Sequence, residues 1–348
     1  MMMAYYFENY GIDALHNYIS EFNPSKIIVI TDNNTQSFCL DYFKNLTNLE
    51  FTNVNIKNGD IHKNINTLSD VWKQLMKAGV DRKTLMINLG GGVVTDLGGF
   101  AAATFKRGLK FIHVPTTLLG MVDAAIGGKN GINFMEAKNQ IGTIVQPEFV
   151  WIFTGFLKTL PEEEFISGFA EMLKHGLIAD RAYWKDLISY AQNPNHNHLL
   201  PGLIKKSVTI KDHIIQEDPF EQGKRKLLNF GHTIGHALES FMNYKKNIPL
   251  SHGKAIAAGM IMEAYLSFKL NGLNQSDLAE IKQSINSLYP IINLSINEIK
   301  EIINLMRFDK KNENGVVKFV LVNRIGSADF NKEAPEQLLY EAFDFYQS

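Results

Sequence analysis

The sequence has few of the features that mark secreted, membrane-spanning or disulfide-bonded proteins. Cys39 is its single cysteine, which excludes an internal disulfide and a zinc site made of cysteines. We expect a buried thiol without a chemical role. No run of about 18 apolar residues occurs, as a membrane helix would require. The opening residues MMMAYYFENYG also lack the basic and apolar regions of a signal peptide, so we expect a cytoplasmic protein.

An excess of charge of either sign is also missing. Lys and Arg total 35 against 36 for Asp and Glu, so the chain has no overall basic field for nucleic acid or an anionic membrane. With 348 residues, of which 45% are hydrophobic, it can bury a sizeable core and is long enough for two domains. These properties are typical of an ordinary globular protein.

The first half of the chain alternates strand patterns with helical patterns. Runs rich in β-branched and apolar residues occur at 26–34, 84–92 and 107–117, and a helical pattern covers DVWKQLMKAG at 70–79. Strands separated by helices predict a parallel sheet with crossover connections. We therefore assign residues 1–159 to a Rossmann-like α/β domain.

Beyond residue 159 the strand patterns nearly vanish. Pro161, followed by three glutamates, suits the first turn of a helix, and long helical patterns continue after it. We assign residues 160–348 to a mostly helical domain, with one strand or small hairpin at 315–326. The polar segment NPNHNHLLPG at 193–202 is interpreted as a loop, whose His196 and His198 are solvated rather than bound to metal.

A glycine-rich turn, LGGGVVTDLGG, follows the second predicted strand and opens a helix. Backbone N–H groups at such a helix start can hold a phosphate. The turn is not a GxGxxG fingerprint, because Thr95 stands where the third glycine would fall, and a tight packing turn is the alternative. Asp32 and Thr116-Thr117 end neighbouring strands, so three strand ends should converge on one crevice. This favours a dinucleotide.

Histidines are grouped in NFGHTIGHALES. His232 and His236 are four residues apart and share a helical face, but the glutamate of a HExxH metalloprotease is missing. Glu171 and His252 are candidates to complete a set of one carboxylate and two imidazoles, which leaves open positions on a catalytic metal. The spacing does not say which two histidines bind, and packed core histidines are the alternative.

Several basic residues lie beside glycines or carboxylates. Any one of them could belong to a solvated helix face, but as a set they suit a substrate that carries phosphate and carboxylate groups. They are Lys129, Lys138, Lys174, Lys211, Arg225 and the pair Lys310-Lys311.

Together these motifs resemble one family closely. The resemblance covers residues 26 to 326 and rests on GGGVVTDLGGFAAATFKRG, VPTTLLGMVDAAIGGKNGIN, KNQIGTIVQP, GFAEMLKHGLIAD, EQGKRKLLNFGHTIGHALE and SHGKAIAAGM. These segments are similar to those of the 3-dehydroquinate synthase family of sugar-phosphate cyclases. The wider superfamily includes metal-dependent polyol dehydrogenases.

The resemblance implies a homodimer of two-domain subunits that bind NAD and a divalent metal, Zn²⁺ or Co²⁺. It implies the conversion of 3-deoxy-D-arabino-heptulosonate 7-phosphate to 3-dehydroquinate and phosphate, through transient oxidation by NAD, phosphate elimination, re-reduction and intramolecular aldol cyclisation. This reaction belongs to the shikimate pathway of aromatic amino acid biosynthesis.

The resemblance also assigns residues to roles. The metal ligands would be Glu171, His232 and His252. NAD would lie against Asp32, Asp60, Lys63, Gly91, Gly92, Val93, Val94, Thr95, Asp96, Thr116, Thr117, Lys129, Lys138, Phe156, Leu157, Lys158 and Thr159. Substrate contacts and proton handling would fall to Asp123, Lys129, Asn139, Lys174, Lys211, Glu221, Arg225, Asn229, His236, Lys310 and Lys311. Arg107 would reach into the partner subunit's site.

The sequence departs from the family pattern in two places. Ala124 and Ala125 replace two serines beside Asp123, and Pro219 replaces a glutamate in DPFEQGKR. These changes remove hydroxyl and carboxyl groups but no assigned catalytic residue. The alternatives to a dehydroquinate synthase are a metal-dependent NAD polyol dehydrogenase, another sugar-phosphate cyclase, or a catalytically dead relative that acts as a binding protein.

Overall fold

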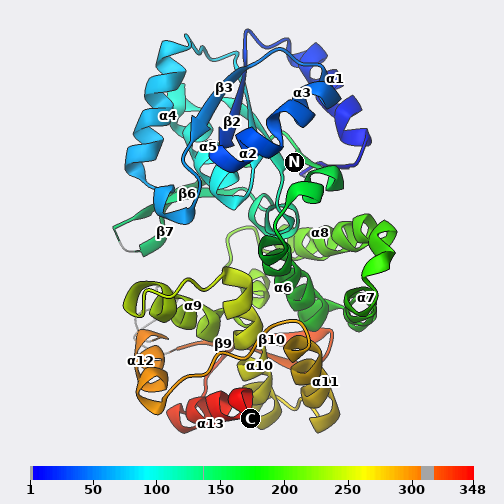
Figure 1. The fold of residues 1–348 in the computed structure, drawn as a ribbon, viewed down its shortest axis with the longest axis vertical. Helices are drawn as coiled ribbons and strands as arrows, with labels where there is room; N and C mark the ends of the chain where they lie inside the picture. The colour runs from blue at the N-terminus through cyan, green and yellow to red at the C-terminus, as the bar shows by residue number, and fades with distance from the viewer. Residues whose placement is uncertain (1–2, 136, 307–316) are drawn as a thin grey trace. The chain divides into compact units, whose positions relative to one another are not determined.

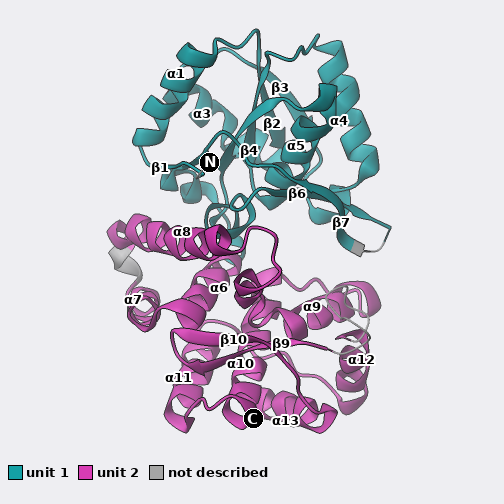
Figure 2. Cartoon of the chain, turned by 180° about the vertical axis from the view of Figure 1, so that it is seen from behind, with its two compact units in different colours: residues 1–165 teal, residues 166–348 magenta. Residues whose placement is uncertain are grey.

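The computed structural model describes residues 3–135, 137–306 and 317–348. The chain divides into two compact units, residues 1–165 and 166–348 (Figure 2). The division falls inside helix α6 (Glu162–Ala179), whereas the sequence-based boundary was placed just before this helix.

The first unit is built on a six-stranded parallel sheet. Its strands are β1 (Tyr5–Phe7), β2 (Ile27–Asp32), β3 (Thr52–Ile56), β4 (Leu85–Gly90), β5 (Lys110–Pro115) and β8 (Val150–Ile152). They lie in the order β1-β8-β5-β4-β2-β3, and every neighbouring pair is parallel. The predicted Rossmann-like α/β fold is therefore confirmed.

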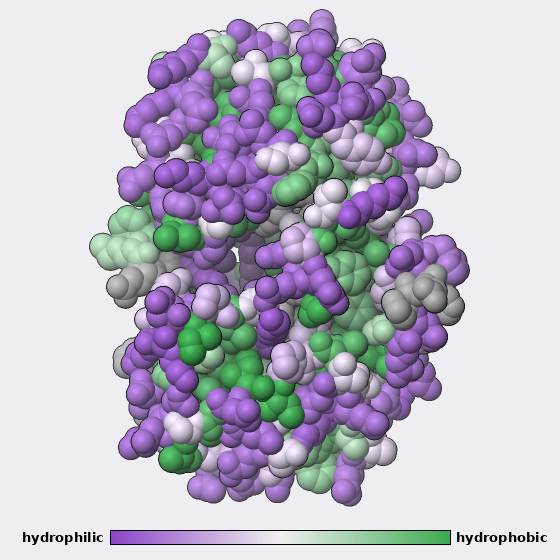
Figure 3. Space-filling view, viewed as in Figure 1, coloured by the Kyte–Doolittle hydropathy of each residue, from purple (hydrophilic) through white to green (hydrophobic). Residues whose placement is uncertain are grey.

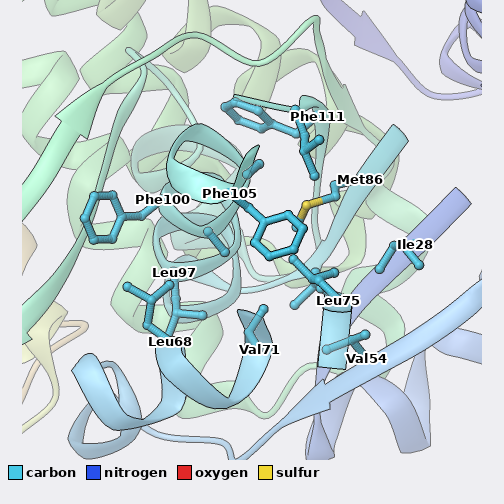
Figure 4. Close-up of a cluster of buried hydrophobic side chains, with 14 of the residues drawn as sticks. Ile28, Val54, Leu68, Val71, Leu75, Met86, Leu97, Phe100, Phe105 and Phe111 are labelled. Carbon is cyan, nitrogen blue, oxygen red and sulfur yellow. The ribbon is translucent and has the colours of Figure 1, made fainter. Parts of the chain in front are cut away.

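Helices cover both faces of this sheet. On one face, α4 (Ile65–Lys77) and α5 (Gly92–Thr104) pack their apolar side chains against β2, β3 and β4, and Figure 4 shows this cluster. On the other face, Trp151 of β8 contacts Phe43 of α3 (Leu40–Thr47) and lies against Gly11 of α1 (Tyr10–Phe22). Burial on both faces explains why β2 and β4 are nearly continuous apolar runs.

Shorter elements complete the first unit. An antiparallel pair, β6 (Lys129–Phe134) and β7 (Ala137–Ile144), lies outside the main sheet. The helical segments are α2 (Asn33–Phe38), η1 (Asp60–His62), η2 (Phe105–Arg107), η3 (Gly120–Ala124) and η4 (Thr154–Thr159).

The second unit is mostly helical, as predicted (Figure 1). After α6 its helices are α7 (Arg181–Gln192), α8 (Leu200–Glu217), α9 (His232–Ser240), α10 (His252–Leu270), α11 (Gln275–Asn286), α12 (Ile296–Met306) and α13 (Glu336–Gln347). Short turns η5 (Pro194–Leu199), η6 (Lys224–Asn229) and η7 (Phe241–Lys245) lie between them. One antiparallel hairpin, β9 (Phe319–Arg324) with β10 (Ser327–Lys332), matches the late strand signal and continues beyond it.

The loop interpretation of residues 193–202 is wrong. The segment forms the helical turn η5 and then the first residues of α8. Pro194 and Pro201 each stand in a first helical turn, where the fixed φ of proline is favourable and its missing N–H is not needed.

Figure 3 shows a mainly hydrophilic face interrupted by smaller hydrophobic areas. Within the described ranges, every helix is too short or too polar to cross a bilayer.

Candidate functional site

In the first unit, the carboxyl ends of β2, β4 and β5 meet at one edge of the sheet. Ile30 pairs with Asn88, so Asp32 ends β2 level with Gly90, and Gly90 pairs with Pro115. Thr116 donates its backbone N–H to the Gly90 carbonyl at 3.0 Å. The predicted convergence of the three strand ends is therefore confirmed. Asp32 has a structural task as well, because its carboxylate caps α2 by accepting from the Thr35 N–H at 2.8 Å.

The N-terminus of α5 opens directly from this edge. Gly91 is its N-cap, and none of the described side chains caps it. A Cβ on Gly91 would lie 2.9 Å from Thr117 Cγ2, so any larger residue here would crowd Thr117. Val94 is fully buried in the core, and Thr95 turns its hydroxyl back to the Gly92 carbonyl at 3.2 Å. Backbone N–H groups at this helix start, such as those of Gly92 and Val93, suit a phosphate.

A polar cluster surrounds Lys63, which is 7% exposed. Its Nζ donates to Asn139 Oδ1 at 2.6 Å and to Asp96 Oδ2 at 3.0 Å, and lies 3.7 Å from Asp60 Oδ1. Lys138 Nζ lies 3.8 Å from Asp60 Oδ2. Burial raises the pKa of Asp96, and the charges of Asp123 and Asp60 add to this while Lys63 opposes it. Residues that are distant in the sequence and are assigned to NAD therefore lie together here. Asn139, which is assigned to the substrate, lies with them.

The segment 156–159 approaches the same strand ends. The Cys39 thiol is buried, and its pKa is influenced by Thr159, Thr116 and the charge of Asp32. Burial raises the pKa of Cys39 to about 11, which keeps the thiol protonated and unreactive. Phe156 is buried, whereas Lys158 is exposed.

The remaining residues assigned in this unit lie in its shorter elements. Asp123 is in η3, whose Ala124 lies against the start of α5: a Cβ on Gly92 would be 3.1 Å from that of Ala124. Lys129 is exposed at the first position of β6. Arg107 is exposed with φ +70°, in a turn that Gly108 completes.

In the second unit, close packing of α6, α9 and α10 brings the predicted metal ligands together. A Cβ on Gly259 of α10 would lie 2.0 Å from the Gly231 carbonyl, so α9 and α10 touch through their backbones. Gly253 of α10 is equally tight against α6, where its N–H donates to Ser167 Oγ at 3.0 Å. The glycines beside the histidines are therefore needed for helix contacts.

Two histidines face one carboxylate. His252 Nε2 lies 3.1 Å and His232 Nε2 lies 3.4 Å from the same oxygen, Oε1 of the fully buried Glu171. The other oxygen, Oε2, forms an ion pair with Lys174, one turn along α6. Two donors on a tetrahedral zinc ion, each about 2.1 Å from the metal, are about 3.4 Å apart. The distances from each histidine nitrogen to Glu171 Oε1 are therefore those expected between ligands of one metal ion.

Hydrogen bonding at the outer nitrogens supports this arrangement. His232 Nδ1 lies 3.0 Å from the Phe230 carbonyl, which can only accept, so Nδ1 carries the hydrogen and a neutral ring presents a lone pair at Nε2. His252 Nδ1 faces Glu239 Oε2 at 3.5 Å. A carboxylate in this outer position commonly orients a metal-binding histidine. A lone pair and a carboxylate repel each other unless a cation or a proton lies between them.

The pKa shifts agree with this geometry. Burial lowers the pKa of His232, and the Lys174 charge adds to the effect. Burial alone would also lower the pKa of His252, but hydrogen bonds and charge from Glu171 and Glu239 raise it to about 9. Burial opposes ionisation of Glu171, yet Lys174 and the histidines hold its pKa well below its usual range. Glu171 is thus ionised, as a metal ligand would need to be.

His236 lies next to this set. Its ring centroid is 5.0 Å from that of His232 and 5.7 Å from that of His252, so His232 and His236 do share a face. Candidate donor atoms of all three histidines lie within 4.8 Å of one another. The contacts with Glu171 favour His232 and His252 as ligands.

Residues assigned to the substrate surround a loop before η6. Lys211 and Arg225 are buried. Asp218 accepts from the N–H groups of Gln222, Gly223 and Arg225 at 2.7 to 3.0 Å and so folds the loop. Arg225 donates to the Pro219 carbonyl at 2.7 Å, and Asn229 donates to Glu221 Oε1 at 2.8 Å. Lys310 and Lys311 lie outside the described residues.

Sequence reasoning missed three carboxylates in this unit: Asp218, Glu239 and Glu263. Glu239 and Glu263 act on groups from other helices, whereas Asp218 acts on backbone N–H groups four to seven residues after it. Only Glu239, seven residues after His232 on the same predicted helix, gave a usable spacing signal.

Comparisons with known proteins cover nearly the whole chain. The sequence model described as 3-dehydroquinate synthase N-terminal matches residues 53–167, and the one described as 3-dehydroquinate synthase C-terminal matches residues 168–312. A 3-dehydroquinate synthase of Parabacteroides distasonis is 39% identical over 334 residues, which are 96% of this chain and 94% of the relative.

Two solved structures share the fold. One is a 2-epi-5-epi-valiolone synthase from Streptomyces hygroscopicus with NAD⁺ and Zn²⁺ bound, with a TM-score of 0.87 and 24% identity, covering 99% of this chain and 97% of the other. The second is a 2-deoxy-scyllo-inosose synthase complexed with carbaglucose-6-phosphate, NAD⁺ and Co²⁺, with a TM-score of 0.83 and 22% identity, covering 98% and 96%.

Proposed function

The chain belongs to the 3-dehydroquinate synthase family, and we propose that the residues described above carry out the reaction of that family. The reaction converts 3-deoxy-D-arabino-heptulosonate 7-phosphate to 3-dehydroquinate and phosphate. The observation that carries the assignment is the convergence of His232 and His252 on Oε1 of Glu171. A catalytically dead relative would have no need to keep this buried and charged set.

NAD belongs at the sheet edge of the first unit. The uncapped N–H groups at the start of α5 would hold its pyrophosphate, and Asp32 stands where a carboxylate accepts from a ribose. The walls of the NAD site would be formed by the Lys63 cluster, by Thr116 and Thr117, and by the segment 156–159. The two cyclase structures that share the fold both carry NAD⁺, which supports this assignment.

Glu171, His232 and His252 would hold a divalent metal, zinc or cobalt. A bound metal would supply Lewis acidity towards a substrate hydroxyl, and bound NAD would supply a reversible hydride acceptor. Lys174 keeps Glu171 ionised, and Glu239 fixes the ring of His252, so the protein presents a preformed set of donors.

The basic residues bind the anionic groups of the substrate. Arg225 is held by the Pro219 carbonyl and Lys211 is buried, so both present charge in fixed positions. The nearby Glu221 and Asn229 are joined by a hydrogen bond and suit hydroxyl groups. His236, on the face of α9 that carries His232, would exchange a hydroxyl proton, as would Asp123. Lys129, Lys310 and Lys311 complete the proposed phosphate and carboxylate contacts.

The assembly is proposed to be a homodimer that works in the cytoplasm. Arg107 is exposed on a glycine-completed turn and is assigned to the partner subunit's site. This assignment predicts that Arg107→Ala lowers turnover but leaves metal and NAD binding unchanged.

Release of inorganic phosphate from the heptulosonate phosphate tests the function. We expect stoichiometric phosphate and 3-dehydroquinate, with no net change in absorbance at 340 nm because NADH is reoxidised within each turnover. A metal-dependent polyol dehydrogenase would instead accumulate NADH and release no phosphate. Turnover of an unphosphorylated sugar or of a hexose phosphate, without turnover of the heptulosonate, would indicate another cyclase.

A further inference from the structure

A buried carboxylate outside the assigned site, Glu263 of α10, contacts the start of α9. The side chain is fully buried, and its oxygens accept three backbone hydrogen bonds. Oε2 accepts from the Gly231 N–H at 2.7 Å, and Oε1 accepts from the N–H groups of Thr233 and Ile234 at 3.1 and 3.2 Å. Burying a carboxylate is costly unless hydrogen bonds or opposite charge compensate, and here three backbone N–H groups do so.

The residue that these bonds enclose is His232. It is the first residue of α9, with Gly231 before it and Thr233 and Ile234 after it. Glu263 thus holds backbone N–H groups before and after this histidine. Because His232 also donates Nδ1–H to the carbonyl of Phe230, next to the clamped Gly231, its ring direction depends on the same stretch of backbone.

The helix cannot cap itself at this point. Its N-cap is Gly231, with φ +77°, and a Cβ there would lie 2.6 Å from Met260 Cγ and 3.0 Å from the Ile256 carbonyl. The close approach of α10 therefore excludes the Ser, Thr or Asp that usually caps a helix. Glu263, one turn further along α10 than Gly259, supplies the missing acceptor from the neighbouring helix, and its charge also suits the positive end of α9.

Glu263 is itself held in place. Ser267 Oγ donates to the Glu263 carbonyl and accepts from the Val322 N–H at 3.0 Å, which ties this turn of α10 to β9. Thr233 Oγ1 donates to the Lys318 carbonyl at 3.1 Å, so the start of α9 is tied to the same region. The carboxylate and its target are thus parts of one rigid arrangement.

We propose that Glu263 is a positioning residue of the metal site, which aims His232 Nε2 by clamping the backbone around it. This inference rests on the proposed function, since it requires that His232 binds a metal. Loss of an outer contact of this kind typically weakens metal binding roughly 10- to 100-fold. The glutamine variant keeps the shape of the side chain but exchanges one acceptor oxygen for an N–H₂ group that faces N–H donors.

The test titrates Co²⁺ into metal-free protein and follows the visible absorption of the bound ion. We expect Glu263→Gln to raise the Co²⁺ Kd roughly 10- to 100-fold and to change the shape of the cobalt spectrum. The matched control is Asp277→Asn in α11, whose buried carboxylate accepts from Arg181 and from the Ile325 N–H. This control should lower Tm while its Co²⁺ Kd stays within about twofold of wild type.

The outcomes separate the inference from the function on which it rests. Wild-type protein that binds no cobalt would overturn both. Cobalt binding by the wild type, with the same Kd and spectrum in Glu263→Gln, would overturn the inference alone. If the glutamine variant does not fold, Glu263→Asp decides, because it keeps the charge but withdraws it by one methylene: weaker cobalt binding supports the proposal, and unchanged binding contradicts it.

Discussion

His232 and His252 direct their Nε2 atoms at a single oxygen, Oε1 of Glu171, from 3.4 and 3.1 Å. His236 is close to both rings but belongs to a different part of the proposed chemistry. The two kinds of histidine can therefore be separated by experiment.

His232→Ala and His252→Ala should each lose the bound metal and at least about 100-fold in turnover, since a ligand is removed. His236→Ala should keep the metal and still lose turnover. Elemental analysis of purified protein, together with phosphate release, checks both results. His213→Ala is the control, because His213 is exposed on α8 and should behave as wild type. Full metal content in His232→Ala would refute its role as a ligand.

Gly91→Ala should weaken NAD binding and destabilise the first unit. The new Cβ would lie 2.9 Å from Thr117 Cγ2, and overpacking of this kind costs about 1 to 3 kcal/mol. Thr117→Ser removes Cγ2 but keeps the hydroxyl that accepts from the Gly120 N–H. The double variant should therefore regain both Tm and NAD affinity, measured by calorimetry. If stability returns but NAD affinity does not, the Cβ obstructs the phosphate site itself.

Much of the first unit could be predicted because its local signals agree. The apolar runs of β2 and β4 are buried on both faces, and strand ends in a parallel sheet must share one edge, which placed Asp32 and Gly91 together. The strands β1, β3 and β8 of the main sheet were not recognised. Segments of three residues, such as β1 and β8, show no reliable period, and β3 has only two apolar residues among five.

The site was harder to predict where it depends on long-range contacts. Lys63 and Asn139 meet although 76 positions separate them. The spacing of the histidines allowed any two of the three as ligands, and only the position of Glu171 relative to their rings distinguishes them. Glu263 gave no motif at all, because its role follows from the exclusion of a side chain at Gly231.

Lys63→Met should destabilise the protein by about 3 kcal/mol and raise KM for NAD. The substitution leaves the carboxylate of Asp96 without its closest cation in a poorly solvated place. Burial already raises the pKa of Asp96, so a neutral side chain at position 96 should be tolerated better than a carboxylate once Lys63 is gone. Adding Asp96→Asn to Lys63→Met should therefore recover most of the stability. Lys73→Met breaks the exposed pair with Asp70 and should change the stability by less than about 1 kcal/mol. Equal losses in the two lysine variants would contradict the burial argument.

Glu298 should give part of the acid sensitivity of the second unit. A hydrogen bond from Lys246 and bonds from Ser295 at the start of α12 lower its pKa from 4.5 to about 2. A pKa that is lower in the folded state stabilises the protein above about pH 4.5, and the contribution disappears as the pH falls towards 2. Because the pair is partly exposed, Glu298→Gln should cost no more than about 1 kcal/mol at pH 7.

Urea unfolding of wild type and Glu298→Gln at pH 7, 4 and 3 measures this contribution. The difference in unfolding free energy should be largest at pH 7 and should shrink at each lower pH, because the wild-type carboxylate is progressively neutralised relative to the unfolded chain. Glu301→Gln breaks the ion pair with Lys245, which is more exposed than the Lys246–Glu298 pair, and should show a smaller difference at pH 7. A Glu298→Gln difference that stayed constant from pH 7 to 3 would mean that shape and hydrogen bonding, rather than charge, anchor the start of α12.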